Sequence, residues 1–200
     1  MPDNNQNPRV QSGSIKRIAL ALLIVTILSQ YCQAAKLADS PDGMWSIQTT
    51  TQGSVAIFNS AGDPVITIDR GTTGSEQLRP KWSSDSKSVI LLDQAPLGSG
   101  ISGAWFDGVR WHATVESDSD LNQAKALAKS QAVSGEVKTE DRELGDWLSR
   151  DTIQIRGALH YLGGKKFSYS YILQIVPGSY ALNRGGFETG GLKASNFQAR

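Results

Sequence analysis

The sequence has little of what metal, redox and disulfide chemistry require. It contains one cysteine, Cys32, and two histidines, His112 and His160, among 200 residues. Neither histidine has a second histidine or a glutamate at a ligand spacing, and structural metal sites need several clustered ligands. A disulfide would need a second cysteine. We therefore expect no metal, no cofactor and no disulfide, and a domain stabilised by an ordinary hydrophobic core.

An excess of charge of one sign is also lacking, because the formal net charge is +1. The basic residues are scattered, and the longest basic run after residue 34 is Lys165-Lys166. Nucleic acids and anionic lipids attract proteins through concentrated positive charge. The sequence therefore predicts no nucleic-acid partner, and a membrane partner only if the N-terminal segment is retained.

Catalytic motifs are absent as well. The segment Gly98–Gly103 lacks the G-x-S-x-G spacing of a nucleophile elbow and the lysine of a phosphate-binding loop. Carboxylates leave one enzymatic alternative, an exported glycan hydrolase that would pair Asp107 or Glu116 with Asp93. We expect no catalytic residues and keep this hydrolase as the alternative.

Residues 1–34 have the pattern of a signal peptide. A basic pair, Lys16-Arg17, precedes the apolar run Ile18–Leu28, and a cleavage site follows before Ala35. A helix over this run would be about 17 Å long, which is shorter than the ~30 Å hydrocarbon core of a bilayer. We expect an exported protein, periplasmic or extracellular. The alternative is an uncleaved N-terminal helix that anchors the protein to a membrane.

A turn motif occurs twice and then a third time in a degenerate form. The first copy is Ser40-Pro41-Asp42-Gly43 followed by Trp45, the second is Trp82–Lys87, and the third is Trp147–Ile153. Asp85 lies 43 residues after Asp42, a spacing typical of one four-stranded propeller blade. The longer interval before the third copy predicts a repeat that carries a helical insertion.

The remaining pattern predicts one mainly-β domain, 35–182, with a single short helix. Runs rich in Val, Ile, Thr and aromatic residues are bounded by turn residues, and helical spacing predicts a helix over 120–132. The polar segment Ser134–Asp146 is typical of a loop, and the Gly-rich segment 183–200 predicts a poorly ordered tail. The predicted strands are 45–51, 54–59, 65–69, 88–93, 103–106, 110–115, 152–161 and 167–176.

The two complete motifs resemble the W-S-P-D-G-K repeats of exported TolB-type, WD40-like β-propellers, over a short stretch at each site. The resemblance implies antiparallel sheets of hairpin units, in which the aspartate forms a turn before an apolar strand and the tryptophan packs between sheets. Propellers need at least four blades, and three repeats fill most of this chain. We therefore expect a partial propeller or a small sandwich.

A candidate binding surface lies at the strongest hairpin signal, Asp107-Gly108. Trp105 and Trp111 flank this turn, so together with Asp107 they would form an aromatic hairpin tip if they are exposed. Packing between sheets is the other interpretation, because most aromatic residues in small domains are buried. We expect a non-catalytic β-repeat module that binds a protein or a cell-envelope component through its sheet edges.

Overall fold

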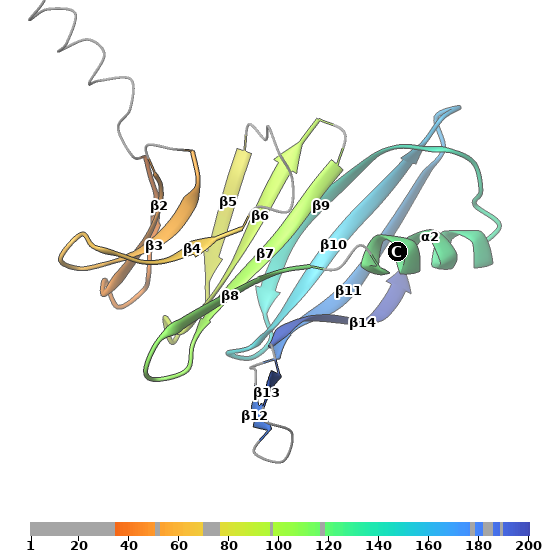
Figure 1. The fold of residues 1–200 in the computed structure, drawn as a ribbon. Coiled ribbons are helices and arrows are strands. Elements are labelled where there is room, and N and C mark those ends of the chain that lie inside the picture. The colour runs from red at the N-terminus through yellow and green to blue at the C-terminus, as the bar shows by residue number, and fades with distance from the viewer. Residues whose placement is uncertain are drawn as a thin grey trace, which may run out of the picture. The chain divides into compact units, whose positions relative to one another are not determined.

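A computed structural model describes residues 35–50, 53–69, 77–96, 98–116, 119–176, 179–181, 186–188 and 190–200. These residues belong to one compact unit, Ala35–Arg200. The predicted signal peptide, residues 1–34, lies outside the described residues. The described part of the chain is mainly β, with four-stranded antiparallel sheets that follow one another along the sequence (Figure 1). The prediction of a mainly-β fold is confirmed.

In each sheet, strands that are neighbours in the sequence pair with one another, apart from an inserted hairpin in the last. The first sheet contains β1 (Lys36–Asp39), β2 (Trp45–Thr49), β3 (Val55–Asn59) and β4 (Pro64–Ile68). The second contains β5 (Gln77–Trp82), β6 (Ser88–Ala95), β7 (Gly98–Phe106) and β8 (Trp111–Val115). The third contains β9 (Val137–Trp147), β10 (Thr152–Tyr161), β11 (Lys166–Val176) and β14 (Gly191–Ala199). The inserted hairpin is β12 (Ser179–Ala181) and β13 (Gly186–Glu188).

The second sheet packs against both of the others. Val89 and Leu91 of β6 lie in an apolar cluster with residues of the first sheet, whereas Ile90 and Leu92 lie in a cluster with residues of the third. Successive side chains of a strand point to opposite faces, so a strand covered on both faces has a continuous apolar run. This requirement explains the unbroken run Val89–Leu92.

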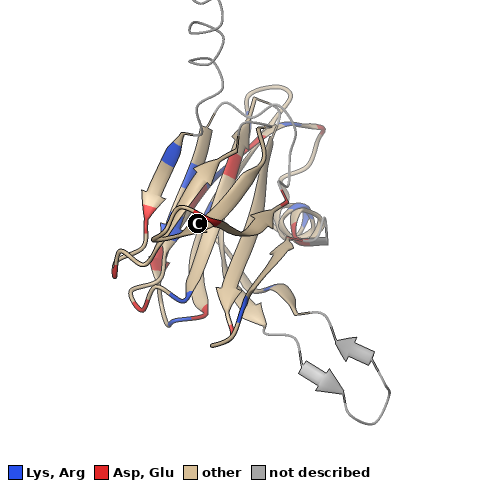
Figure 2. Ribbon diagram, turned by 60° about the vertical axis from the view of Figure 1, so that its left-hand side comes forward, with Lys and Arg blue, Asp and Glu red and all other residues tan. Residues whose placement is uncertain are grey.

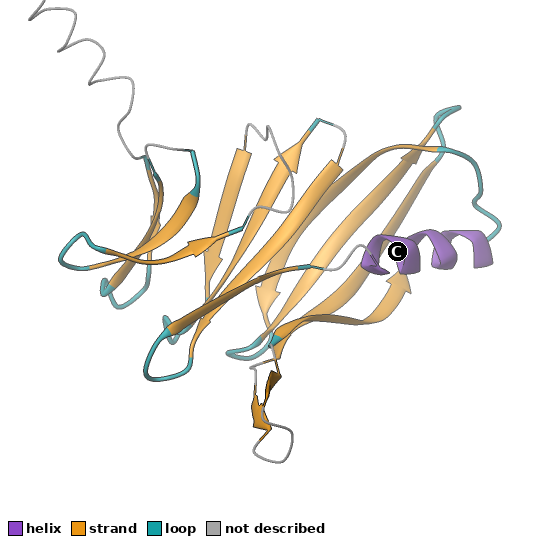
Figure 3. Cartoon of the chain, in the orientation of Figure 1, coloured by secondary structure: helices purple, strands orange, loops and turns teal. Residues whose placement is uncertain are grey.

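One helix, α2 (Ser119–Ser130), connects the second sheet to the third, which confirms the predicted helical insertion (Figure 3). Its small face buries Ala124 and Ala128 completely in the core of the third sheet, and it contacts β14. Asp120 in its first turn and Lys129 in its last turn suit the helix dipole. Within the described ranges, no helix is both long and apolar enough to cross a membrane.

Several segments differ from the predictions. No strand was predicted over β1 or β5, and β7 begins at Gly98 instead of residue 103. Ser134–Asp146 was expected to be a loop, but most of it belongs to β9. Charged side chains lie on both faces of this strand, because Glu140 and Arg142 are buried while Glu143 is exposed, so apolar alternation is missing. The predicted poorly ordered tail is wrong for Gly191–Ala199, which pairs with β11 as strand β14.

Candidate functional site

The three turn motifs take equivalent places in the three sheets. Turn 1 (residues 40–45) joins β1 to β2, turn 2 (83–88) joins β5 to β6, and turn 3 (148–152) joins β9 to β10. The sequence repeat therefore matches a repeat in topology. Turns 1 and 2 are hydrogen-bonded to each other, and turns 2 and 3 line one pocket. We call this end of the sheets, together with the β7–β8 turn (107–110), the turn edge.

Turns 1 and 2 share one hydrogen-bond pattern. In turn 1 the Ser40 Oγ donates to Asp42 Oδ1 at 2.6 Å, and in turn 2 the Ser83 Oγ donates to Asp85 Oδ1 at 2.7 Å. The same aspartate oxygen accepts the backbone N–H two residues later, at 3.0 Å in turn 1 and 3.1 Å in turn 2. The hydrogen bond from Ser40 and that from the backbone lower the pKa of Asp42. The carboxylates thus stabilise the turns themselves.

Ser86 replaces glycine in turn 2 and makes a contact that glycine could not. Its φ of 60° matches the 71° of Gly43 in turn 1, a left-handed conformation that is uncommon for residues with a side chain. The buried Ser86 Oγ accepts the Asp42 backbone N–H at 3.0 Å. The serine therefore links turn 2 to turn 1.

Turn 3 is a shortened version of the other two. The Ser149 Oγ donates to Asp151 Oδ1 at 2.5 Å, and the Thr152 Oγ1 donates to the same oxygen at 3.1 Å. The Leu148 N–H closes the turn on the Thr152 carbonyl at 2.8 Å. The hydrogen bond from the Ser149 hydroxyl lowers the pKa of Asp151. This effect is larger than that of burial, which acts to raise the pKa. The serine and aspartate of the degenerate copy thus keep their roles in a turn that closes over fewer residues.

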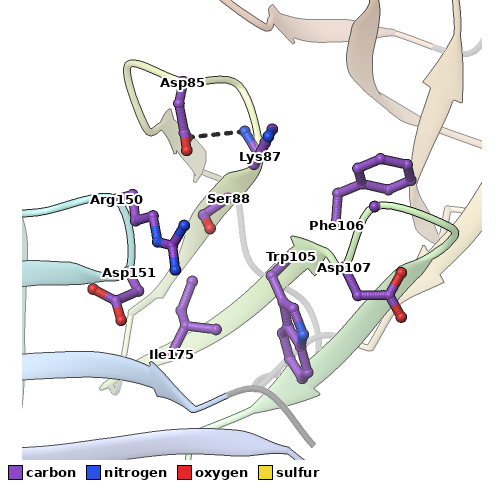
Figure 4. Close-up of a pocket in the computed structure, with 10 residues that line it drawn as sticks. Asp85, Lys87, Ser88, Trp105, Phe106, Asp107, Arg150, Asp151 and Ile175 are labelled. Atoms are coloured by element: carbon purple, nitrogen blue, oxygen red, sulfur yellow. Dashed lines mark hydrogen bonds between the residues drawn. The ribbon is translucent and has the colours of Figure 1, made fainter.

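A pocket of about 310 Å³ opens on the turn edge, between turn 2, turn 3 and the β7–β8 turn (Figure 4). Trp105 and Ile175 form its apolar part, and the Arg150 side chain points into it (Figure 4). The other lining residues are Asp85, Lys87, Ser88, Phe106, Asp107, Gly108 and Asp151.

The structure brings two of the three predicted surface residues to this pocket, namely Trp105 and Asp107. The condition for an aromatic hairpin tip is not met, because Trp105 and Trp111 are each only 6% exposed, as the interpretation of packing between sheets requires. The strand register pairs Trp105 with His112 and Phe106 with Trp111. The two tryptophans therefore point to opposite faces of the hairpin and belong to different apolar clusters.

Asp107 is held in an ionised state by its own turn. Its Oδ1 accepts the backbone N–H groups of Val109 at 2.8 Å and Arg110 at 2.9 Å, and its Oδ2 lies 2.7 Å from His112 Nε2. The Arg110 N–H and then His112 and Val109 lower the pKa of Asp107 far below its ordinary value. The His112 ring in turn stacks on Trp105, with ring centroids 5.3 Å apart.

Lys87 and Arg150 supply the positive charge of the pocket. Both residues are exposed, and within the described part of the chain neither side chain has an ion-pair partner. The three aspartates of the lining instead accept hydrogen bonds from their own turns. Lys87 and Arg150 can therefore donate to a ligand at this pocket, beside carboxylates that are already held by their own turns.

The carboxylates of the hydrolase alternative do not come together. Asp107 and Glu116 stand at opposite ends of β8. Asp93 is fully buried on β6 and, by strand alternation, shares the face of Leu91 that packs toward the first sheet. Glu116 instead bonds Tyr171 of the third sheet. Among the described residues, no group of three or more His, Cys, Asp or Glu side chains could hold a metal ion.

A buried charge cluster that the sequence did not predict lies against the inner face of the third sheet. It consists of Glu116, Glu140, Arg142, Tyr169 and Tyr171. Arg142 pairs with both glutamates, and all three side chains are 5% exposed. The Tyr169 hydroxyl donates to Glu140, and the Tyr171 hydroxyl donates to Glu116 at 2.5 Å. Burial raises the pKa of Glu116, against the opposing attraction of Arg142. The signal from which this cluster could have been predicted is the pair of opposite charges, Glu140 and Arg142, two residues apart in the sequence.

Comparison of the chain with protein-family models and with curated protein sequences finds no match.

Proposed function

We propose that this protein is an exported, non-catalytic binding module that contacts a protein partner at its turn edge. The carrying observation is a group of large apolar side chains that are exposed in or beside the turns of this edge. Clusters of exposed apolar residues with a polar rim are typical of interaction sites. The group consists of Met44, Val109, Leu148 and Val176, which are 39 to 88% exposed.

The pocket adds specificity to this surface. Its apolar part, Trp105 and Ile175, is flanked by the cations Lys87 and Arg150, which have no ion-pair partner among the described residues. A partner segment that places an apolar side chain in the pocket and an acidic group beside it would satisfy both features. Interfaces of this kind combine an apolar centre with charged groups at the rim.

The lowered pKa values of the pocket carboxylates favour a role in binding over a role in hydrolysis. A general acid works best when its pKa lies near the working pH. Hydrogen bonds instead lower the pKa of Asp107 and of Asp151. These carboxylates are poor proton donors, and their role as turn acceptors explains their presence.

The sheet edges are less suited to binding a partner than the turn edge. The outer strands of the first two sheets have between four and six residues, and two of them contain a proline, Pro64 or Pro80. Short edges and proline discourage the addition of a further strand.

The equivalent placement of the three turns supports a relationship to WD40-like repeats, which we include in the proposal.

Site-specific photo-cross-linking in cells that produce the protein tests the binding proposal. A photoreactive residue at Val109 should give a discrete protein adduct, because this side chain is the most exposed apolar group of the turn edge. The matched control is Leu162, which is 54% exposed in the turn at the other end of β10. The absence of a protein adduct at position 109, or the same adduct at position 162, would refute the proposal.

Export is tested separately by N-terminal sequencing of the protein recovered from outside the cytoplasm. We expect a mature chain that begins at Ala35. A full-length chain that remains in the cytoplasm would contradict this part of the proposal.

A further inference from the structure

Five exposed lysines gather at the end of the third sheet that lies opposite the turn edge. Lys125 and Lys129 lie on α2, Lys138 on β9, and Lys165 and Lys166 at the β10–β11 turn. We call this group the lysine end. The ten residues of β10 separate it from turn 3, a distance of about 33 Å at the rise of a strand. Figure 2 shows basic residues on the helix beside the sheets.

Two neighbouring hollows bring these lysines together. Lys125 and Lys129 line one of about 380 Å³, and Lys138 and Lys165 line another of about 370 Å³. Both hollows include the buried ring of Tyr161 in their walls. Lysines that are up to 40 positions apart in the sequence therefore line adjoining hollows, whereas Lys166 lines a separate one.

The positive charge of the lysine end is not neutralised within the described residues. None of the five lysines has an ion-pair partner there. Acidic residues also lie nearby. Glu136 lines the first hollow, Asp141 and Glu143 line the hollow of Lys166, and Asp141 is bound to His160 Nε2 at 2.8 Å. A chain with a net charge of +1 thus carries a concentrated positive field at one end.

An exposed apolar side chain stands among these charges. Leu162 is 54% exposed at the tip of the β10–β11 turn, three residues before Lys165. The backbone beneath it is fixed, because the Leu162 N–H donates to the Glu136 carbonyl at 2.9 Å and the Tyr161 N–H donates to the Lys165 carbonyl at 2.9 Å. The turn therefore presents an apolar tip that is surrounded by flexible cations.

We propose that the lysine end docks on the surface of an anionic phospholipid bilayer, with Leu162 entering the interface. Lysines near an anionic bilayer are attracted to its surface potential, and their long apolar stems follow the interface while the ammonium groups stay in water. An apolar tip flanked by basic residues is the pattern of interfacial attachment. Docking in this orientation points the turn edge away from the bilayer, where a protein partner can reach it.

The side-chain chemistry favours a bilayer over a nucleic acid. The two hollows that share Tyr161 are lined by lysines and by no arginine. Lysines act as hydrated point charges, whereas specific phosphate recognition relies on the planar, bidentate guanidinium of arginine. A diffuse array of ammonium groups suits a fluid surface of phosphates. The exposed Leu162 has no role in binding a phosphodiester backbone.

Vesicle co-sedimentation of the full-length protein tests this inference. Vesicles of phosphatidylcholine are compared with vesicles that also contain phosphatidylglycerol, at low and high salt. We expect phosphatidylglycerol to increase binding and salt to remove the increase. The variant K125Q/K129Q/K165Q should lose roughly tenfold or more of the phosphatidylglycerol-dependent affinity. The apolar segment 18–28 is common to all variants, so its contribution cancels in the comparison.

A matched variant removes the same charge elsewhere, at exposed basic residues outside the lysine end and outside the pocket. K36Q/R79Q/K193Q should bind like the unmodified protein, and circular dichroism verifies that both variants are folded. An equal loss in both triple variants, or no effect of phosphatidylglycerol on the unmodified protein, would overturn the inference. L162N should weaken binding with little change in salt dependence, and unchanged binding would overturn the insertion of Leu162. Tighter binding to duplex DNA than to the anionic vesicles would overturn the choice of partner.

Discussion

Carboxylates occupy two contrasting environments in this molecule, the buried charge cluster and the turn edge. In the cluster, burial raises the pKa of Glu116 although Arg142 lies beside it. At the turn edge, hydrogen bonds from their own turns lower the pKa of Asp107 and Asp151. The buried carboxylate depends on partners that are far away in the sequence, Arg142 and Tyr171, whereas the surface carboxylates depend on donors within a few residues. Substitutions in the cluster should therefore lower the free energy of unfolding strongly and disturb residues far apart in the sequence. Substitutions at the turns should lower it only slightly and act locally.

The largest expected effect comes from removing the cation of the buried charge cluster. Arg142→Ala leaves Glu116 and Glu140 buried without their partner, and breaking a buried pair in this way costs about 3–5 kcal/mol. Urea denaturation measures the loss in the free energy of unfolding. The exposed Arg150→Ala is the control and should change stability by less than about 0.5 kcal/mol. Similar losses in the two variants would remove the contrast between the regions.

A second variant acts on the ring that supports the cluster. Gly157 pairs with Tyr169 across β10 and β11, and a Cβ at Gly157 would lie 2.3 Å from the Tyr169 ring. Gly157→Ala should therefore displace the ring and destabilise the protein by about 1–3 kcal/mol. Gly191→Ala serves as the control, because a Cβ there meets no atom within 4 Å. Thermal unfolding of both variants measures the difference, and equal melting temperatures would exclude displacement of the Tyr169 ring as a source of instability.

A smaller loss is expected at turn 2. The buried Ser83 Oγ donates to Asp85 and accepts the Ser88 N–H at 3.0 Å. Ser83→Ala should cost about 1–2 kcal/mol, since it leaves a buried donor without its acceptor. Ser84→Ala, at the exposed next position, should be close to neutral in the same denaturation experiment. A neutral effect at both positions would show that the serine is not needed to close the turn.

The smallest expected effect is a difference in pH dependence between the two environments. Because the pKa of Glu116 is raised in the folded protein, its contribution is present at low pH and is lost as the pH rises above 4.5 through the folded value. Because the pKa of Asp151 is lowered, its contribution is present above 3.8 and is lost as the pH falls through the folded value. Glu116→Gln should flatten the first dependence, and Asp151→Asn should flatten the second. Free energies of unfolding measured across this pH range test both, and slopes unchanged by either variant would refute the assignment.

Local signals in the sequence predicted much of the fold. Apolar runs between turn residues identified β2–β4 and β6–β8 but not β1 or β5. The spacing of the aspartates identified the sheet repeat and its helical insertion. Strand β9 was missed because Glu140 and Arg142, which face inward, are charged and hide the alternation that marks a strand. Their pairing with Glu116 depends on a contact between residues far apart in the sequence, which a local pattern does not contain.

The candidate site was predicted only in part, because here too the missing information lies in contacts between residues far apart in the sequence. The Asp107-Gly108 signal placed the β7–β8 turn correctly and identified the pocket residue Asp107. The burial of Trp105 and Trp111 depends on the sheets that cover the two faces of the hairpin, which sequence spacing does not reveal. The lysine end was invisible because its members are scattered along the chain, so net charge and charge runs understate the local field.

The hydrogen bond from the Asp42 N–H to Ser86 Oγ helps to fix the position of the first sheet along the second. Apolar packing between sheets is non-directional, so the core alone would tolerate a small sliding movement of one sheet over the other. A hydrogen bond has a narrow range of distance and angle, and this one lies at the rim, where a small slide would break it. Ser86 therefore helps to hold two repeats in place relative to each other. A glycine at this position would relieve the backbone strain but would lose this hydrogen bond.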